Sequence, residues 1–205
     1  RGQSADHPTV RLPRCAIDFY DLPRAFESVV LPSVVQNIIV PNTPYGCDYY
    51  VHYYEQSKEP SGRSGSGGTI DPQEILLLRQ EVERAAKQHN LTRIPTVHFT
   101  SDTEQDFWEQ YDDLLQKIRT TRVDGTNTTT NNNTSNNNTN DNNNLLYFPW
   151  KDTSYQYPVT TDNIIKMWHS IQSVWNLMDH YANTSNSIKY TRVAMLRADV
   201  MYLTP

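Results

Sequence analysis

The order of strand and helix patterns near the start of the chain limits the fold more than any other feature. Asp48–Tyr54 is rich in aromatic and β-branched residues, and Cys15–Tyr20 is a shorter run of the same kind, so both are predicted to be buried strands. Between them, apolar residues recur at the spacing of one helical face, at Phe26, Val30, Val34 and Ile38. A strand, a helix and a strand form a βαβ unit, so we expect the two strands to be parallel neighbours.

The same alternation continues through the middle of the chain. Asp71 precedes a proline at a predicted helix start, and Pro95–Thr100 is predicted to be the third strand. Ser101 and Glu104 are expected to form the capping box of the next helix. The residues expected to point inward from that helix are Phe107, Tyr111, Leu114 and Ile118.

A long amphipathic helix is predicted over Thr161–Tyr181. The residues expected on its buried side are Ile164, Trp168, Ile171, Trp175 and Met178, which makes the two tryptophans core residues rather than platforms for a sugar. Arg192–Leu196 is then predicted to be a strand, and the apolar run Val200–Leu203 another. The alternation predicts an α/β fold, a three-layer sandwich with a mostly parallel, Rossmann-like sheet, and ligands bind such sheets beyond the carboxyl ends of the strands.

The amino-acid composition limits the domain organisation of the chain and the kinds of partner it can bind. We expect a single domain over residues 14–205 after a flexible lead-in, 1–13. The insertion 123–144 is mostly Asn, Thr and Ser and is predicted to be disordered, because it has too little apolar surface to offset the entropy of ordering. A net charge of −5 without a run of Lys or Arg argues against a nucleic-acid partner or an anionic membrane surface.

Several common motifs are missing from the sequence. It has no Gly-rich P-loop, no Gly-x-Ser-x-Gly, no Cys-x-x-Cys and no His-Glu-x-x-His, which argues against a P-loop kinase, a common serine hydrolase and a zinc enzyme. His52 lies within a predicted buried strand and is interpreted as a core histidine whose hydrogen bonds are satisfied. The other histidines lack the spacing of metal ligands.

Two pairs of residues bear on the cellular compartment. Cys15 and Cys47 each stand at the start of a predicted strand, and a disulfide and two buried thiols are both compatible with that placement. Asn90 and Asn183 begin glycosylation sequons outside the Asn-rich tract, although such short sequons also arise by chance in cytosolic proteins. The chain begins with Arg1 rather than Met, so a signal peptide or membrane anchor upstream would leave no trace in it.

Four segments together resemble a group of poorly characterised glycosyltransferase-like proteins of the GT-A type. Their pattern is a strand with a Gly-x-x-Arg loop, a helix, an Asp-hydrophobic-Val-His strand and a terminal Tyr-x-x-Val-x-x-x-Arg-x-Asp. The corresponding segments here are Phe19–Arg24, Asn37–Pro41, Cys47–Tyr53 and Tyr190–Asp199. The resemblance covers residues 14–56 and 145–205. Two departures are Asp21, where the loop pattern has Gly, and Arg197, where GT-A enzymes have the first Asp of Asp-x-Asp.

The resemblance implies a donor-binding domain that transfers a sugar from a nucleotide sugar to a glycan or glycoprotein acceptor, in the Golgi lumen. It places Arg24, Arg197, Asp199, Asn163 and Lys166 around the donor, with Mn²⁺ or Mg²⁺ on Asp199. In GT-A proteins the catalytic base or nucleophile lies beyond the metal motif. The chain is therefore expected to be a donor half, truncated at its carboxyl end, whose catalytic residue is unknown.

Three other interpretations stay open. Asp199 could cap the turn after its strand, with Arg197 as its ion-pair partner. The arginine in place of an aspartate also suits a non-catalytic, secreted or membrane-tethered binding module on the same fold. An interaction protein that acts through its Asn-rich loop and its glycans would bind no nucleotide at all.

Overall fold

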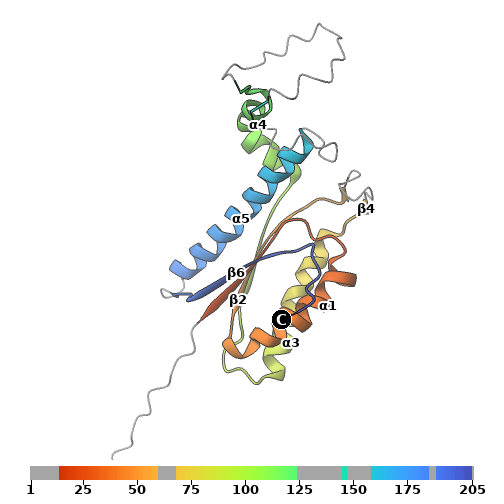
Figure 1. Cartoon of the computed structure of the whole chain (residues 1–205). Coiled ribbons are helices and arrows are strands. Elements are labelled where there is room, and N and C mark those ends of the chain that lie inside the picture. Colours follow the sequence, from red (N-terminus) through yellow and green to blue (C-terminus); the bar gives the residue numbers. More distant parts are fainter. Residues whose placement is uncertain (1–13, 60–67, 124–144, 147–157, 185–187, 205) are drawn as a thin grey trace, which may run out of the picture.

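The structure is a computed structural model that describes residues 14–59, 68–123, 145–146, 158–184 and 188–204. Its centre is a sheet of four parallel strands in the order β5-β2-β1-β6 (Figure 1). These strands are β1 (Cys15–Tyr20), β2 (Asp48–Tyr54), β5 (Val97–Asp102) and β6 (Arg192–Arg197). The predicted α/β fold and parallel sheet are confirmed, whereas the predicted lead-in and residues 124–144 of the predicted insertion lie outside the described residues.

Helices cover both faces of this sheet, which gives three layers (Figure 1). Alternate strand residues, including Ile17, Phe19, Tyr49 and Val51, pack against a helical stretch at 26–45 and against α3 (Leu77–Gln88). On the other face, Ala16 and Tyr50 pack against α5 (Val159–Thr184). The side-chain period of two along each strand therefore divides the core into two halves.

The helical stretch between β1 and β2 contains prolines and stays helical by changing its pitch. Wide π turns (η1, Phe26–Val30; η2, Val35–Ile39) alternate with short α segments (α1, Leu31–Val34; α2, Val40–Asn42), and a 3₁₀ turn, η3 (Thr43–Tyr45), ends it. Its three prolines each occupy one of the first two positions of an α or 3₁₀ segment. A proline lacks the backbone N–H, and the changes of pitch place it where that donor is least needed.

The two capped helix starts differ in how well they were predicted. Asp71 caps the 3₁₀ turn η4 (Pro72–Leu76) that leads into α3, and its side chain accepts a hydrogen bond from the Gln73 backbone N–H at 2.9 Å. The predicted Ser101–Glu104 capping box is wrong, because β5 extends through Asp102 and the box is formed by Thr103 and Asp106 at the start of α4 (Glu104–Thr120). On α4, Phe107 is buried as predicted, whereas Leu114 is exposed and Leu115 is buried.

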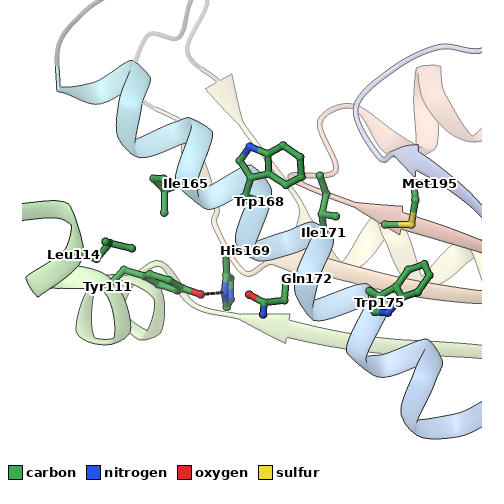
Figure 2. A pocket seen from close by; sticks show the side chains of 9 residues that line it. All are labelled: Tyr111, Leu114, Ile165, Trp168, His169, Ile171, Gln172, Trp175 and Met195. Carbon is green, nitrogen blue, oxygen red and sulfur yellow. Dashed lines mark hydrogen bonds between the residues drawn. The ribbon is translucent and has the colours of Figure 1, made fainter. Parts of the chain in front are cut away.

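The buried face of α5 differs from the predicted one. Trp168 and Trp175 are 59% and 48% exposed, so their assignment to the core is wrong, while His169 and Ser170 are buried and Met178 is buried as predicted. In Figure 2, Trp168 leaves α5 on a different side from His169. The physical reason lies in the sheet: the strand residues under α5 include polar side chains, so the helix presents polar partners to them instead of its aromatic stripe.

A second, two-stranded antiparallel sheet is formed by β3 (Lys58–Glu59) and β4 (Gly68–Thr69). Val200–Leu203 forms no strand, contrary to expectation. Over the residues that the structure describes, no helix is both long and apolar enough to cross a membrane.

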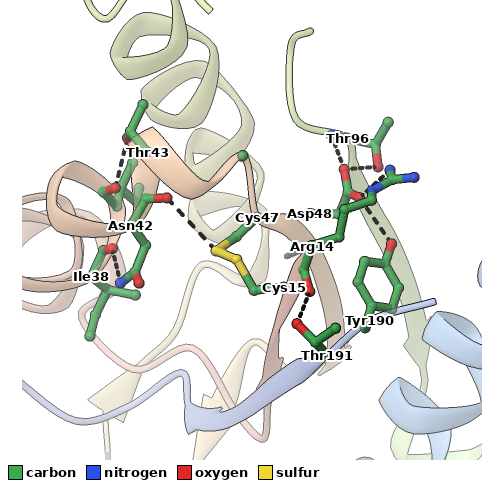
Figure 3. Close-up of a disulfide and its surroundings, with 12 residues drawn as sticks. Arg14, Cys15, Ile38, Asn42, Thr43, Cys47, Asp48, Thr96, Tyr190 and Thr191 are labelled. Carbon is green, nitrogen blue, oxygen red and sulfur yellow. Dashed lines mark hydrogen bonds and ion pairs between the residues drawn. A yellow bond between two sulfur atoms is a disulfide. The ribbon is translucent and has the colours of Figure 1, made fainter. Parts of the chain in front are cut away.

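A disulfide joins the amino ends of the two central strands (Figure 3). Cys15 and Cys47 precede the paired residues Ala16 and Asp48, their Cα atoms are 4.5 Å apart, and the bridge that the strand order allowed is present. Asp48 is fully buried beside it and accepts hydrogen bonds from surrounding donors on Arg14, Arg93, Thr96 and Tyr190. Burial alone would raise the pKa of Asp48, but the Thr96 N–H and the Arg93 guanidinium outweigh it and hold that pKa below its usual value.

Candidate functional site

The carboxyl ends of β1 and β6 lie side by side in the sheet. The chain moves outward from β1 to β2 and then β5, and it returns to the other side of β1 with β6. The segments after β1 and β6 turn onto the same face of the sheet, where the Tyr202 backbone N–H donates to Ser33 Oγ at 3.0 Å. In open α/β sheets ligands bind outside the carboxyl ends of the strands. Arg24 follows β1, and Arg197 and Asp199 lie at the end of β6.

These three side chains meet in one cluster. The Arg24 Nη1 donates to Asp199 Oδ2 at 2.5 Å, and Arg197 donates from Nε and Nη2 to the two Asp199 oxygens at 2.8 and 2.7 Å. Arg197 Nη2 also lies 3.2 Å from Asp21 Oδ2. The Arg24 and Arg197 side chains are 39% and 40% exposed, whereas that of Asp199 is 8% exposed. Two guanidinium groups thus lie toward solvent above two more deeply placed carboxylates.

The electrostatics of the cluster follow from this layering. Burial raises the pKa of Asp21, and the negative charge of Asp199 raises it further. The hydrogen bonds to Asp199 raise the pKa of Arg197 above its ordinary value, so this guanidinium is charged at every accessible pH. The cluster is therefore formally near neutral, with its positive ends the more accessible.

The loop after β1 has a strained backbone. Asp21 has φ 84° and Ala25 has φ 46°, both in the left-handed region that side chains other than Gly rarely occupy. A positive φ at position 21 favours Gly, and Asp tolerates it better than most other residues. Two strained residues in one five-residue loop at the ligand edge are typical of functional sites rather than of simple connections.

Three of the five residues predicted to border the donor come together, and two lie elsewhere. Lys166 Nζ pairs with Glu104 Oε1 at 2.5 Å and lies above the Trp108 ring, so its charge is directed toward α4. Asn163 is exposed near the start of α5. Both oxygens of Asp199 accept hydrogen bonds from guanidinium groups, so a Mn²⁺ or Mg²⁺ ion at this carboxylate would have to displace them; the predicted metal there stays a prediction.

A second cluster lies at the same edge, under α5. His52 Nε2 is 2.9 Å from Asp102 Oδ2, and His169 Nε2 is 2.6 Å from the same oxygen. His52 and His169 are buried, and the Asp102 side chain is 30% exposed. The interpretation of His52 as a buried, satisfied histidine agrees with these contacts, but sequence spacing could not show that a histidine from a distant helix shares its carboxylate.

The outer nitrogens of both rings also have partners. His52 Nδ1 is 2.6 Å from Ser170 Oγ, and His169 Nδ1 is 3.0 Å from the Tyr111 hydroxyl. If each ring donates its Nε2–H to Asp102, each Nδ1 accepts a hydroxyl proton, and all these contacts are satisfied by neutral imidazoles. Burial lowers the pKa of His52, in accord with its neutral form. Burial alone would raise the pKa of Asp102, but hydrogen bonds from His169 and His52 outweigh it and lower that pKa.

Ser170 connects the two clusters. Its hydroxyl oxygen accepts a hydrogen bond from the Asp21 backbone N–H at 2.8 Å, in addition to its contact with His52. The side chain of Asp21 in turn faces Arg197. One buried hydroxyl on α5 therefore touches both the strained loop after β1 and the imidazole–carboxylate group.

An open groove of about 640 Å³ runs along α5 next to the second cluster (Figure 2). Its lining is mostly apolar and includes Trp168 and Trp175, with His169, Tyr111 and Gln172 as its polar members. Figure 2 shows the Tyr111 hydroxyl pointing to His169, with Gln172 alongside. The groove gives solvent and small molecules a route to this end of the imidazole–carboxylate cluster.

Comparisons with known proteins returned no match. No protein family, no curated protein and no solved structure is significantly similar to this chain. The chemistry of the two clusters therefore has to be argued from their own geometry.

Proposed function

We propose that this domain binds a nucleoside-diphosphate sugar at the carboxyl ends of β1 and β6 and serves as the donor-binding part of a GT-A-like glycosyltransferase. The sugar would pass to a glycan or glycoprotein acceptor. The observation that carries the proposal is the meeting of Arg24 and Arg197 at the carboxyl edge of the sheet. Arg24 comes from the loop after β1 and Arg197 from the end of β6, 173 positions apart in the chain (197 − 24). The resemblance of both loops to glycosyltransferase-like proteins agrees with this placement.

The two arginines suit a diphosphate in geometry and charge. A guanidinium presents its donors in a planar fork that matches phosphate oxygens, and it keeps its charge. When the sugar leaves, negative charge develops on the diphosphate, and cations already fixed in place stabilise it. Because Asp199 is held by both arginines, this arrangement leaves neutralisation to the arginines, and we derive no step through a metal ion at Asp199.

The compartment proposed is the lumen of the secretory pathway, and the Golgi in particular. The Cys15–Cys47 disulfide supports it, because such bonds persist in oxidising compartments and are rare in the cytosol. Asn90 and Asn183 are both exposed, as acceptors of glycans must be.

Binding of the chain to UDP- and GDP-sugars, with and without Mn²⁺, tests the proposal. Arg197→Gln is the main variant, and Arg192→Gln is its matched control, because it changes the same residue type at the opposite, amino end of β6. Loss of a charge-assisted contact costs about 1.5–3 kcal/mol, so Arg197→Gln should weaken binding about 10- to 100-fold while Arg192→Gln leaves it unchanged. Equal affinity of both variants, or no binding by the unaltered chain, would refute the proposal.

A second candidate is a binding module that holds the nucleotide sugar without transferring it. It is favoured by the arginine in place of the first acid and by the engagement of Asp199 in ion pairs. The complete protein separates the two candidates: release of nucleoside diphosphate in the presence of acceptor glycans indicates transfer, whereas tight donor binding without release indicates a binding module. Failure to bind any nucleotide sugar would favour the interaction protein.

A further inference from the structure

A metal-binding geometry exists at the imidazole–carboxylate cluster, apart from the arginine cluster. His52 is in β2, Asp102 is the last residue of β5, and His169 is in α5. One ligand atom from each of these side chains lies within 4.8 Å of the other two. We propose that the three side chains bind one divalent first-row transition-metal ion, with Zn²⁺ as the best match. The proposal does not depend on nucleotide binding.

The donor set selects the class of metal. Two imidazole nitrogens with one carboxylate oxygen are ligands typical of Zn²⁺ and of other first-row transition metals, whereas Mg²⁺ and Ca²⁺ prefer oxygen alone. Its two nitrogen donors distinguish this site from Asp199, where the Mn²⁺ or Mg²⁺ expected from the sequence would meet oxygen donors only. Three protein ligands leave one position of a tetrahedral ion for water or substrate, which is the arrangement of catalytic zinc sites.

The positions of the ligand atoms require little change. Bonds of about 2.0–2.1 Å to a tetrahedral ion put neighbouring ligand atoms about 3.3 Å apart. The two nitrogens now lie 2.9 and 2.6 Å from Asp102 Oδ2, held there by hydrogen bonds. The two nitrogens lie within 4.8 Å of each other, so movements of the side chains, including a rotation of the partly exposed Asp102 carboxylate, would bring the three atoms to this spacing.

The outer partners of both histidines fit a metal site as well. Metal-bound histidines nearly always donate their other ring N–H to a nearby acceptor, which fixes the ring. Here each Nδ1 faces a hydroxyl, on Ser170 for His52 and on Tyr111 for His169. When the ion takes Nε2, the ring proton moves to Nδ1 and is donated to that hydroxyl oxygen. Each imidazole stays neutral, so no net proton has to be released from the rings.

The site is accessible from solvent. His52 and Ser170 are buried, so they form the rigid floor of the site, while the Asp102 side chain is 30% exposed. The groove along α5 reaches His169 from the side. An ion can thus enter from solvent and retain a coordination position on the accessible side.

The test is titration of the full chain, free of any histidine tag, with Co²⁺ and Zn²⁺ in the absence of nucleotide. We expect one equivalent of Co²⁺ to give the visible absorption bands of a low-coordinate nitrogen–oxygen site, and Zn²⁺ to displace it and raise the melting temperature. His169→Gln should weaken binding at least about 100-fold. His180→Gln is the matched control, since it changes an exposed histidine on the same helix, and it should bind as the unaltered chain does.

Tyr111→Phe adds a readout that a purely structural histidine pair would not give. Loss of an outer hydrogen bond to a metal ligand typically weakens metal affinity 10- to 100-fold, so we expect a drop in this range while the metal-free melting temperature stays nearly unchanged. If the unaltered chain binds no equivalent of Zn²⁺ or Co²⁺ at about 10 µM, or if His169→Gln binds as tightly as His180→Gln, the proposal is wrong. Because the probe is the metal alone, these outcomes say nothing against nucleotide binding at the arginine cluster.

Discussion

The two edges of the parallel sheet are built on different principles. At the amino edge, a disulfide joins the first two strands and the buried Asp48 is surrounded by donors. At the carboxyl edge, charged groups from β6 and from the segments after β1 and β6 meet with their cationic ends partly exposed, and the loop after β1 is strained. At the amino edge, the disulfide and the hydrogen bonds to Asp48 stabilise the fold. The groups at the carboxyl edge could exchange their present partners for a ligand. Stability and function are thus expected to reside at opposite ends of the same strands.

The largest effect on stability is expected at Asp18, which lies in the middle of β1, between the two edges of the sheet. Its side chain is fully buried, neither carboxylate oxygen has a hydrogen-bond partner within the described part of the chain, and burial raises its pKa to about 7. The folded state therefore holds this proton more tightly than the unfolded state, so the free energy of unfolding falls as pH rises from about 4 to about 7. Three pKa units correspond to about 4 kcal/mol.

Chemical denaturation of the unaltered chain and of Asp18→Asn across this pH range measures the effect. The difference in stability between the two proteins should shift in favour of Asp18→Asn as pH rises, because an amide cannot ionise. Asp112→Asn, an exposed carboxylate on α4, serves as the control. A pH-independent difference would mean that Asp18 does not titrate in this window.

The disulfide is expected to have the next largest effect. It closes a loop between residues 32 positions apart, and the chain-entropy estimate for a loop of this size is about 3–4 kcal/mol. Cys15→Ser with Cys47→Ser should lower the urea midpoint accordingly and leave both carboxyl-edge clusters able to bind their ligands. A loss of nucleotide or metal binding in a variant that is still folded would show that the two edges are coupled.

Asp48→Ala should destabilise the protein by about 3 kcal/mol. Removal of one partner of a buried charge pair commonly costs 3–5 kcal/mol, and the lower end applies because Arg14 and Arg93 can turn toward water. Asp112→Ala is the matched control. Equal stability of the two variants would show that the amino edge contributes less than its hydrogen bonds suggest.

The smallest effect is expected at Arg197. Its side chain is 40% exposed, and exposed ion pairs are typically worth about 0–1 kcal/mol, so Arg197→Gln should change the melting temperature little while weakening nucleotide binding. If Arg197→Gln were strongly destabilised, Arg197 would belong with the residues that stabilise the fold. That result would favour the interpretation in which Arg197 serves only as the ion-pair partner of Asp199.

The sequence predicted the sheet well and the side-chain partners less well. β1 and β2 are found at their predicted bounds, because runs of aromatic and β-branched residues with period two are unambiguous. The predicted buried face of α5 was wrong because bulky residues lie on both of the faces that could turn inward. The polar strand residues beneath the helix decide which face does so. Capping at Thr103 was misplaced by two residues because β5 continues through polar Ser101 and Asp102, which carry no strand signal.

The two candidate sites also differ in how well the sequence predicted them. Arg24 and Asp199 could be placed on one edge from strand order alone, and they do meet. The group formed by His52, Asp102 and His169 could not, since its members come from three elements and share no sequence spacing. Such a convergence depends on the register of β2 with β5 and on the rotation of α5, which sequence patterns leave undetermined.

The position of Ser170 makes the two clusters one thermodynamic system. A hydroxyl has a single proton, so it can point at His52 Nδ1 only while that nitrogen lacks a proton of its own. Any event that protonates or turns that ring reorients the hydroxyl, and the oxygen that receives the Asp21 N–H changes its partners at the same moment. Coupling of this kind is reciprocal: whatever free energy a ligand at the imidazoles transmits to the loop, a ligand at the loop returns in equal measure.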